Sequence, residues 1–410
     1  MVKKIIIGLG VCIGFVITCY IFVYVSVKSQ HKKLSQGRLT TELVCDTIPF
    51  TYSSSGYILI EAKVNGGEET YPFILDSGAS NMVFSTFTNG YHLENNGFGI
   101  SIGSAENLFL TRIKEINSLQ IGNIEFRELN AEETDFNFNC TENVCGIIGT
   151  GLMHHLVWQI DFNNQIIIIS KYLDDLQFQD NTIEIPLHEN KYSHHLSTDI
   201  KLRNNKSTKE VLIDLGSNNI FSFKESSILK DSINLRSKRI KGQISKSLGN
   251  NKNNTSDYRY YLLDSLIFSR SLYFVNNIPI GTSSKSLNLL GLGFLKKYKS
   301  TISWSDKKLI LEPYDSIPDF NWKTTGFSIK YNKELKKAEI GTITENTPAA
   351  RANVPLNAQV IAVNEILFSD LESYCNSRKM KLVSDTIYLK IKKGDGSVKE
   401  YPLIKEPIFQ

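Results

Sequence analysis

The chain has 410 residues, of which 41% are apolar and 10% are aromatic, and its formal net charge at pH 7 is +4. Two or three domains with hydrophobic cores fit into this length, so the composition excludes an intrinsically disordered chain. The small net charge argues against a nucleic-acid partner. The basic stretch from Arg236 to Lys241 is therefore interpreted as a solvated loop.

An uncharged run over residues 5–27 comes first in the chain. This run matches the roughly 20 residues that a membrane helix needs. The alternative is a signal peptide, but the apolar part of a signal peptide is shorter than this run. We therefore predict a transmembrane anchor within residues 1–33. Basic residues are more numerous after the run than before it, which by the positive-inside rule places the body in the cytoplasm. We nevertheless expect an extracytoplasmic body, in the periplasm or at the cell surface, and the orientation stays open.

Two hairpins of one design follow, 138 residues apart. Residues 60–76 align without a gap on residues 198–214. In each copy an alternating strand meets a turn and returns as an apolar strand that ends at an aspartate, Asp76 or Asp214. The repeat predicts two related, mainly β lobes, each of which delivers one carboxylate.

Each aspartate opens a tight turn, and each copy later contains an apolar-apolar-glycine element. The next apolar strand begins 11 residues beyond that glycine in both copies. Glycine leaves room for a tight turn and lets backbone N–H groups approach a carboxylate. The residues of the two turns and of their supporting strands are Ser77, Gly78, Leu215, Gly216, Gly149 and Gly291.

With these motifs, residues 40–313 resemble the pepsin and retropepsin superfamily of aspartic proteases. The resemblance implies a two-lobed acid-protease β-barrel fold, with lobe 1 over residues 40–180 and lobe 2 over residues 181–316. It also implies that Asp76 and Asp214 are the catalytic pair and that the substrate is a peptide or protein. Because one chain carries both halves, a monomer is sufficient. No cofactor and no metal is implied.

The chemistry of such a pair explains the choice of residues. A water between two carboxylates can lose a proton to one of them, while the other, protonated, donates a hydrogen bond to the carbonyl of the peptide bond. Two close carboxylates cannot both ionise, so they share one proton. In the family, a β-hairpin covers the substrate, and residues 97–110 occupy the matching place.

Leu215 departs from the family's pattern. A hydroxyl residue normally follows each aspartate and braces the turn across the lobe interface; Ser77 fits this pattern, and Leu215 does not. Two hypotheses follow. Either packing by Leu215 replaces the brace and the protein is an aspartic endopeptidase, or the protein is a catalytically inactive protease-like protein that binds peptides.

The cysteines and histidines suggest little further chemistry. Cys140 and Cys145 bracket an acidic loop and can form a small disulfide in an oxidising compartment, with unpaired thiols as the alternative. Cys45 and Cys375 lie in different predicted domains, and neither is part of a metal-site or nucleophile motif. Histidines occur as adjacent pairs at residues 154–155 and 194–195, and adjacent residues of a strand point to opposite faces, so no metal site is predicted. Residues 224–258 are interpreted as a loop-rich insertion.

The last unit, residues 322–405, is similar to a PDZ domain, which is an α+β fold. In PDZ domains a peptide adds as a strand beside the first loop. That loop is expected at Gly326, Phe327, Ser328 and Ile329. The Gly-Asp that usually precedes the next strand is replaced by Asn357-Ala358, which weakens the expectation of a normal carboxylate pocket. A packing appendage without a ligand is the alternative.

Overall fold

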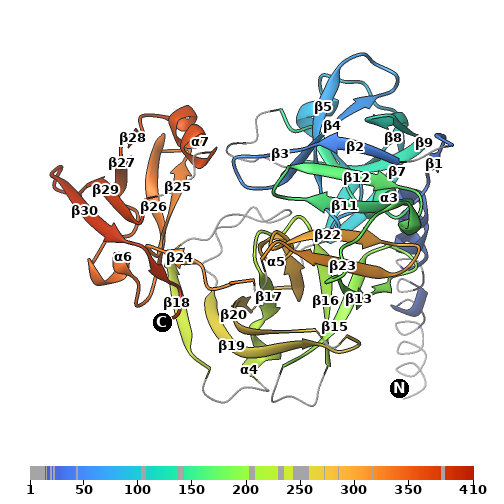
Figure 1. The fold of residues 1–410 in the computed structure, drawn as a ribbon. Helices are drawn as coiled ribbons and strands as arrows, with labels where there is room; N and C mark the ends of the chain where they lie inside the picture. The colour runs from blue at the N-terminus through green and yellow to red at the C-terminus, as the bar shows by residue number, and fades with distance from the viewer. Residues whose placement is uncertain are drawn as a thin grey trace, which may run out of the picture.

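The structure is a computed structural model. It describes residues 14, 16–18, 21, 24–42, 45–102, 108–135, 140, 143–202, 208–229, 235–242, 258–271, 273–284, 286–315, 318–379 and 384–410. Over these residues the architecture is mainly β, as the sequence predicts (Figure 1).

The first barrel closes in the strand order β4-β5-β10-β6-β9-β8, and β8 pairs back onto β4. Its strands are β4 (Ile58–Val64), β5 (Thr70–Leu75), β6 (Met82–Phe84), β8 (Leu108–Ile121), β9 (Ile124–Thr134) and β10 (Gly146–Ile148). Attached to it are β1 (Arg38–Leu39), β3 (Thr51–Tyr52), β7 (Asn95–Ile102), α2 (Ser85–Thr88) and α3 (Thr150–Met153). Buried alternating side chains of these strands fill the barrel.

The second barrel repeats the first, in the order β15-β16-β21-β17-β20-β19, with β19 pairing back onto β15. Its strands are β15 (Leu196–Leu202), β16 (Thr208–Asp214), β17 (Phe221–Lys224), β19 (Arg259–Phe268), β20 (Phe274–Ser283) and β21 (Leu289–Gly291). The parallel pairs β5–β10 and β6–β9 have their counterparts in β16–β21 and β17–β20. The predicted internal repeat is therefore confirmed in the backbone.

A six-stranded sheet joins the two barrels (Figure 1). Its strands, in spatial order, are β13 (Ile183–Pro186), β23 (Lys308–Pro313), β22 (Tyr298–Ser303), β11 (Val157–Asp161), β12 (Ile166–Ser170) and β2 (Cys45–Pro49). At its centre β11 and β22 are antiparallel, with Trp158 opposite Ile302. One hydrophobic core runs through both barrels and this sheet. Shorter elements of this half of the chain are η1 (Leu173–Asp175), β14 (His188–Glu189), α4 (Glu225–Leu229) and α5 (Leu292–Leu295).

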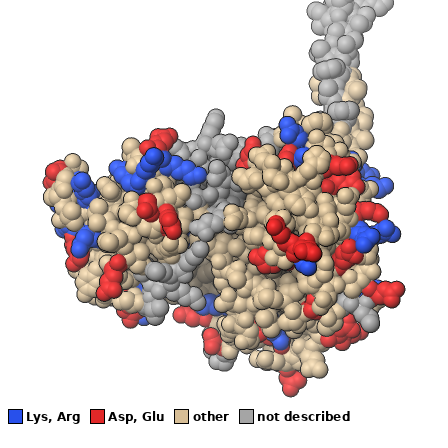
Figure 2. Space-filling model, turned by 90° about the horizontal axis from the view of Figure 1, so that it is seen from above, with Lys and Arg blue, Asp and Glu red and all other residues tan. Residues whose placement is uncertain are grey.

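The C-terminal unit has a separate core of its own. Its elements are β25 (Phe327–Asn332), β26 (Lys337–Thr344), α6 (Pro348–Arg351), β27 (Gln359–Val363), β28 (Ile366–Leu367), α7 (Leu371–Lys379), β29 (Thr386–Lys392) and β30 (Val398–Ile404). A small pair, β24 (Lys323–Thr324) and β31 (Glu406–Pro407), closes it. Figure 2 shows a recess between this unit and the barrels on the upper face of the molecule.

Strand β18 (Ser237–Gly242) connects the C-terminal unit to the second barrel. It pairs with β19 on one side and with β26 on the other, so one sheet continues from the barrel into the C-terminal unit. The interpretation of the basic stretch as a solvated loop is therefore wrong. Only Ile240 of this strand is buried, so the sequence carries little strand signal, and the two flanking strands provide its backbone partners.

The predicted transmembrane segment lies mostly outside the described residues. Residues 24–34 at its end are helical. In the part of the chain that the structure describes, no helix has the length and apolarity that crossing a bilayer requires.

Cys140 and Cys145 do not form the small disulfide that the sequence left open, because Cys140 is bonded to Cys375 on α7. The two Cα atoms lie 5.1 Å apart although their sequence separation is 235. Cys145 is a buried free thiol, and its backbone is held in place by hydrogen bonds to Phe84 and Pro72. The disulfide links the first barrel to the C-terminal unit.

Candidate active site

The two predicted aspartates lie at equivalent places in the two barrels. Asp76 directly follows β5, and Asp214 is the last residue of β16. Each of these strands has a parallel neighbour, β10 or β21, that ends beside the aspartate. The Asp76 N–H donates to the Ile148 carbonyl at 3.0 Å, so the sheet itself sets the position of the carboxyl group.

The fold brings the two carboxyl groups into contact. They lie close enough for one, when protonated, to donate a hydrogen bond to the other. Asp76 accepts the Gly78 N–H at 2.7 Å, and Asp214 accepts the Gly216 N–H at 2.8 Å. A Cβ at Gly78 would lie 2.5 Å from Asp214 Oδ1, and one at Gly216 would lie 2.2 Å from Asp76 Oδ2. Only glycine permits this approach of each turn to the opposite carboxylate.

The environment of the pair favours a shared proton. Burial raises the pKa of Asp214, and the neighbouring charge of Asp76 raises it further, well above its usual range. Burial also raises the pKa of Asp76, but hydrogen bonds from Gly78 and from Asp214 oppose this effect. Such surroundings favour a state in which one carboxyl group of the pair is protonated and the other is ionised. Both residues remain partly accessible to solvent.

Ser77 connects the two turns that contain the aspartates. Its hydroxyl donates to the Ile213 carbonyl at 2.8 Å and accepts the Leu215 N–H at 3.1 Å. Leu215 is fully buried and packs in the common core, where its side chain can form no hydrogen bond. The brace across the interface therefore comes from the first barrel alone.

The two supporting glycines pack against the turns that contain the aspartates. A Cβ on Gly149 would lie 2.3 Å from the carbonyl oxygen of Ala79. A Cβ on Gly291 would lie 2.4 Å from the carbonyl oxygen of Asn219. Asn81, which the sequence analysis missed, accepts the Gly149 N–H at 3.1 Å through its side chain. These contacts fix the strand that supports each turn.

Strands β7 and β8 form the hairpin predicted near residues 97–110, although residues 103–107 lie outside the described part of the chain. The helical segment before the first barrel packs on this hairpin, because Gln30 accepts the Ile100 N–H at 2.7 Å. Gln30 also donates to buried Glu132, whose other oxygen accepts from Ser80 at 3.1 Å. Burial raises the pKa of Glu132. No sequence signal pointed to Gln30 or Glu132.

Tyr57 is a further residue that sequence reasoning missed. It lies between β3 and β4 and is close enough to the two aspartates for both of their charges to affect its pKa. Burial, together with the charges of Asp76 and Asp214, raises the pKa of Tyr57 to about 12, so the phenol remains protonated.

The histidines are arranged differently from the prediction. His154 and His155 follow helix α3 rather than lying in a strand, and their ring centroids are only 3.9 Å apart. The His154 ring also stacks on His194 at 3.9 Å, and His194 contacts Glu189, which pairs with Lys307. Within the described residues, no group of three or more His, Cys, Asp or Glu side chains is arranged to hold a metal ion.

Acid is expected to destabilise the protein through these histidines. Burial and neighbouring histidines lower the pKa of His154 to about 3 and that of His195 to about 4. In the unfolded chain the pKa of a histidine is about 6.5, which is above these folded-state values. The contribution of each histidine to the free energy of unfolding is therefore fully present above pH 6.5 and is lost as the pH falls. The loss is about 1.4 kcal/mol per pH unit for each group. His154→Gln should reduce the loss between pH 6.5 and 4.5 by about 2 kcal/mol, measured by urea denaturation at both pH values.

His92 provides the matched control, because it is exposed. The substitution His92→Gln should leave the acid-induced loss unchanged. Equal losses in the wild type and in His154→Gln would contradict the explanation.

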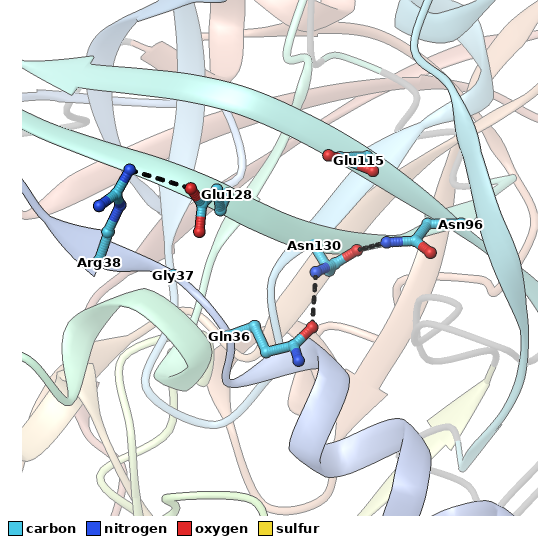
Figure 3. A pocket seen from close by; sticks show the side chains of 7 residues that line it. All are labelled: Gln36, Gly37, Arg38, Asn96, Glu115, Glu128 and Asn130. Atoms are coloured by element: carbon cyan, nitrogen blue, oxygen red, sulfur yellow. Dashed lines mark hydrogen bonds and ion pairs between the residues drawn. The ribbon is translucent and has the colours of Figure 1, made fainter.

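A polar hollow beside the first barrel contains none of the predicted site residues (Figure 3). Its volume is about 480 Å³, and its lining residues are Gln36, Gly37, Arg38, Asn96, Glu115, Glu128 and Asn130. These side chains largely bind one another: Arg38 pairs with Glu128 at 3.0 Å, and Asn130 bonds both Asn96 and Gln36. It is therefore a weaker candidate for a functional site than the aspartate pair.

The predicted peptide-binding loop, residues 326–329, begins strand β25. Gly326 has a positive φ of 85°, and a Cβ there would lie 1.9 Å from Thr347 Oγ1, so glycine is required. The Tyr374 hydroxyl on α7 donates to the Ile329 carbonyl at 3.2 Å. The Ile329 carbonyl of β25 therefore already accepts a hydrogen bond from α7 within the chain.

No protein-family model matches the chain, and no curated protein matches its sequence. A function must therefore be inferred from the geometry of the site. The residues that the structure brings together are the two aspartates and their turns, whereas the loop at residues 326–329 belongs to a separate unit.

Proposed function

We propose that the protein is an aspartic endopeptidase with a two-lobed acid-protease fold. The observation that carries the proposal is the proximity of the Asp76 and Asp214 carboxyl groups, which come from equivalent turns of two equivalent barrels. Such a pair is expected to share one proton. Both halves of the site lie on one chain, so a monomer is sufficient.

The reaction requires only a water and these two groups. The ionised carboxylate removes a proton from a water held between the pair, while the protonated carboxyl group donates a hydrogen bond to the carbonyl oxygen of the peptide bond. The oxygen of the water then bonds to the carbonyl carbon. Transfer of a proton to the amide nitrogen lets the C–N bond break and releases an amine and a carboxylic acid. The near-symmetric surroundings allow the two aspartates to exchange roles.

A catalytically inactive peptide-binding protein is the second candidate. The observation that favours it is Leu215, which leaves the second turn without a hydroxyl brace. The bridge made by Ser77 favours the first candidate, because it already holds both turns together through the Ile213 carbonyl and the Leu215 N–H.

The C-terminal unit, with its similarity to a PDZ domain, is proposed to position the substrate. The segment before the barrels is proposed to anchor the protein in a membrane, with the body on the extracytoplasmic side. The Cys140–Cys375 disulfide supports this side, because disulfides persist in oxidising compartments.

The test is hydrolysis of an unfolded protein by the full chain between pH 4 and 7, followed by mass spectrometry of the products. We expect internal cleavage that a peptide mimic with a hydroxyl in place of the scissile carbonyl blocks, because such a group resembles the tetrahedral species. Binding of peptides that all remain intact would favour the second candidate.

A further inference from the structure

The C-terminal unit is attached to the first barrel next to the turn that leads into β4. The Cys140–Cys375 disulfide joins the two parts, and the Ser54 hydroxyl donates to the Cys140 carbonyl at 2.7 Å. From α7, Arg378 Nε donates to the Ser54 carbonyl at 3.0 Å. On its other side the unit continues the sheet of the second barrel through β18. These contacts hold α7 at a defined place relative to both barrels.

The turn that Arg378 contacts also touches the second catalytic turn. Asn218, four residues after Asp214, donates to the Ser55 carbonyl at 2.8 Å. A Cβ at the next residue, Gly56, would lie 3.1 Å from the Asn218 side chain. Arg378, the turn at residues 53–56 and the turn of Asp214 therefore form one continuous set of contacts.

Tyr57 provides a second, independent link between Arg378 and the catalytic pair. The charges of Asp76, Asp214 and Arg378 all act on its phenol, the two carboxylates raising its pKa and the guanidinium lowering it. Arg378 therefore lies within electrostatic reach of the same side chain that senses both aspartates.

The positive charge of Arg378 is exposed and is not neutralised by a described carboxylate. Its contacts in the described residues are with the Ser54 carbonyl, with the Tyr374 hydroxyl at 3.2 Å and with the Tyr374 ring. A guanidinium has five N–H donors in a fixed plane. These contacts fix the orientation of the guanidinium and leave its other N–H donors for a ligand. A carboxylate is the group that such a fork binds best.

We infer that Arg378 selects substrates that carry an aspartate or glutamate on one side of the cleaved bond. An extended peptide advances about 3.3 Å per residue, so the positions to scan for the acidic side chain are those about two to four residues from that bond. The inference rests on the proposed function and names its substrate class: acidic segments of unfolded peptides. It also gives the C-terminal unit a role, which is to carry one wall of the substrate site.

The test uses pairs of peptides that differ only in Glu or Gln, at two, three or four residues on either side of the cleaved bond. For the full-length protein at pH 6, we expect kcat/KM to favour Glu over Gln by about 5- to 30-fold at one of these positions. Arg378→Gln should abolish this ratio, and Arg378→Glu should reverse it in favour of a peptide with Lys at that position. The preference should weaken between 50 and 500 mM salt, because exposed charges are screened.

Lys399→Gln, which removes an exposed cation on β30 of the same unit, is the control and should keep the ratio. Equal kcat/KM for Glu and Gln at every position, or a preference that survives in Arg378→Gln, would overturn the inference. If no peptide is cleaved, the proposed function fails, and dissociation constants for the same peptide pairs decide the inference separately. Tighter binding of the Glu peptide that is lost in Arg378→Gln supports it, and equal binding overturns it.

Discussion

Replacing Asp76 with asparagine is expected to lower kcat/KM for peptide hydrolysis by at least about 1000-fold. An amide can neither accept the proton of the water nor share a proton with Asp214. Asp214→Asn should have the same effect, and the double variant should be little worse than either single one, because the two groups act as a unit. Steady-state kinetics with one cleavable peptide measure all three variants.

A stability measurement separates lost chemistry from lost folding. Burial and the neighbouring carboxylate raise the pKa of Asp214 in the folded state. The stability contribution of such a group is full below its unfolded pKa and is lost as the pH rises through the folded pKa. An asparagine does not ionise, so Asp214→Asn does not lose this stability as the pH rises. Its urea midpoint at pH 7 should therefore be higher than that of the wild type. Asp174→Asn, an exposed carboxylate on η1, is the matched control and should change neither activity nor midpoint.

Full activity in Asp76→Asn or Asp214→Asn would contradict the role of the pair. An inactive variant with a raised urea midpoint would show that the fold persists without the chemistry.

Loss of the Cys140–Cys375 disulfide is expected to lower the free energy of unfolding by about 3–5 kcal/mol. The bond joins residues with a sequence separation of 235, and a cross-link over so long a loop removes much conformational entropy from the unfolded chain. Urea denaturation of Cys375→Ser, and of the wild type with and without reductant, measures the effect.

Cys45→Ser removes an exposed free thiol and should stay within about 0.5 kcal/mol of the wild type. Reductant should leave Cys375→Ser unchanged, because the bond is already absent. Equal stability of the wild type in the presence and absence of reductant would refute the expected contribution.

Much of the barrel architecture could be predicted from local patterns. The alternation in residues 58–64 and 196–202 and the apolar strands that return to Asp76 and Asp214 follow from the period of a strand. Strand β15 begins and ends 138 residues after β4 does, which is the offset of the repeat in the sequence. The two aspartates and their glycines were found because each copy of the repeat confirms the other.

The residues that surround the pair could not be predicted in this way. Tyr57 and Asn81 have no motif, and they acquire a role only through side chains that lie far away in the sequence. The same holds for the buried Glu132 and its partner Gln30, which are 102 residues apart. A hydrogen bond or a burial penalty depends on distance in space, which a single sequence does not contain.

The sequence by itself determined the two β units, the order of their turns and the carboxylates that the turns present, because hydrogen bonding within hairpins and the alternation of side chains are local. Only the tertiary structure decided that Cys140 pairs with Cys375, that the basic stretch is strand β18 and that the histidines gather around His154. Cys375, strand β26 and His194 are the partners that lie far away in the sequence, and packing of complete units brings them to Cys140, to β18 and to His154.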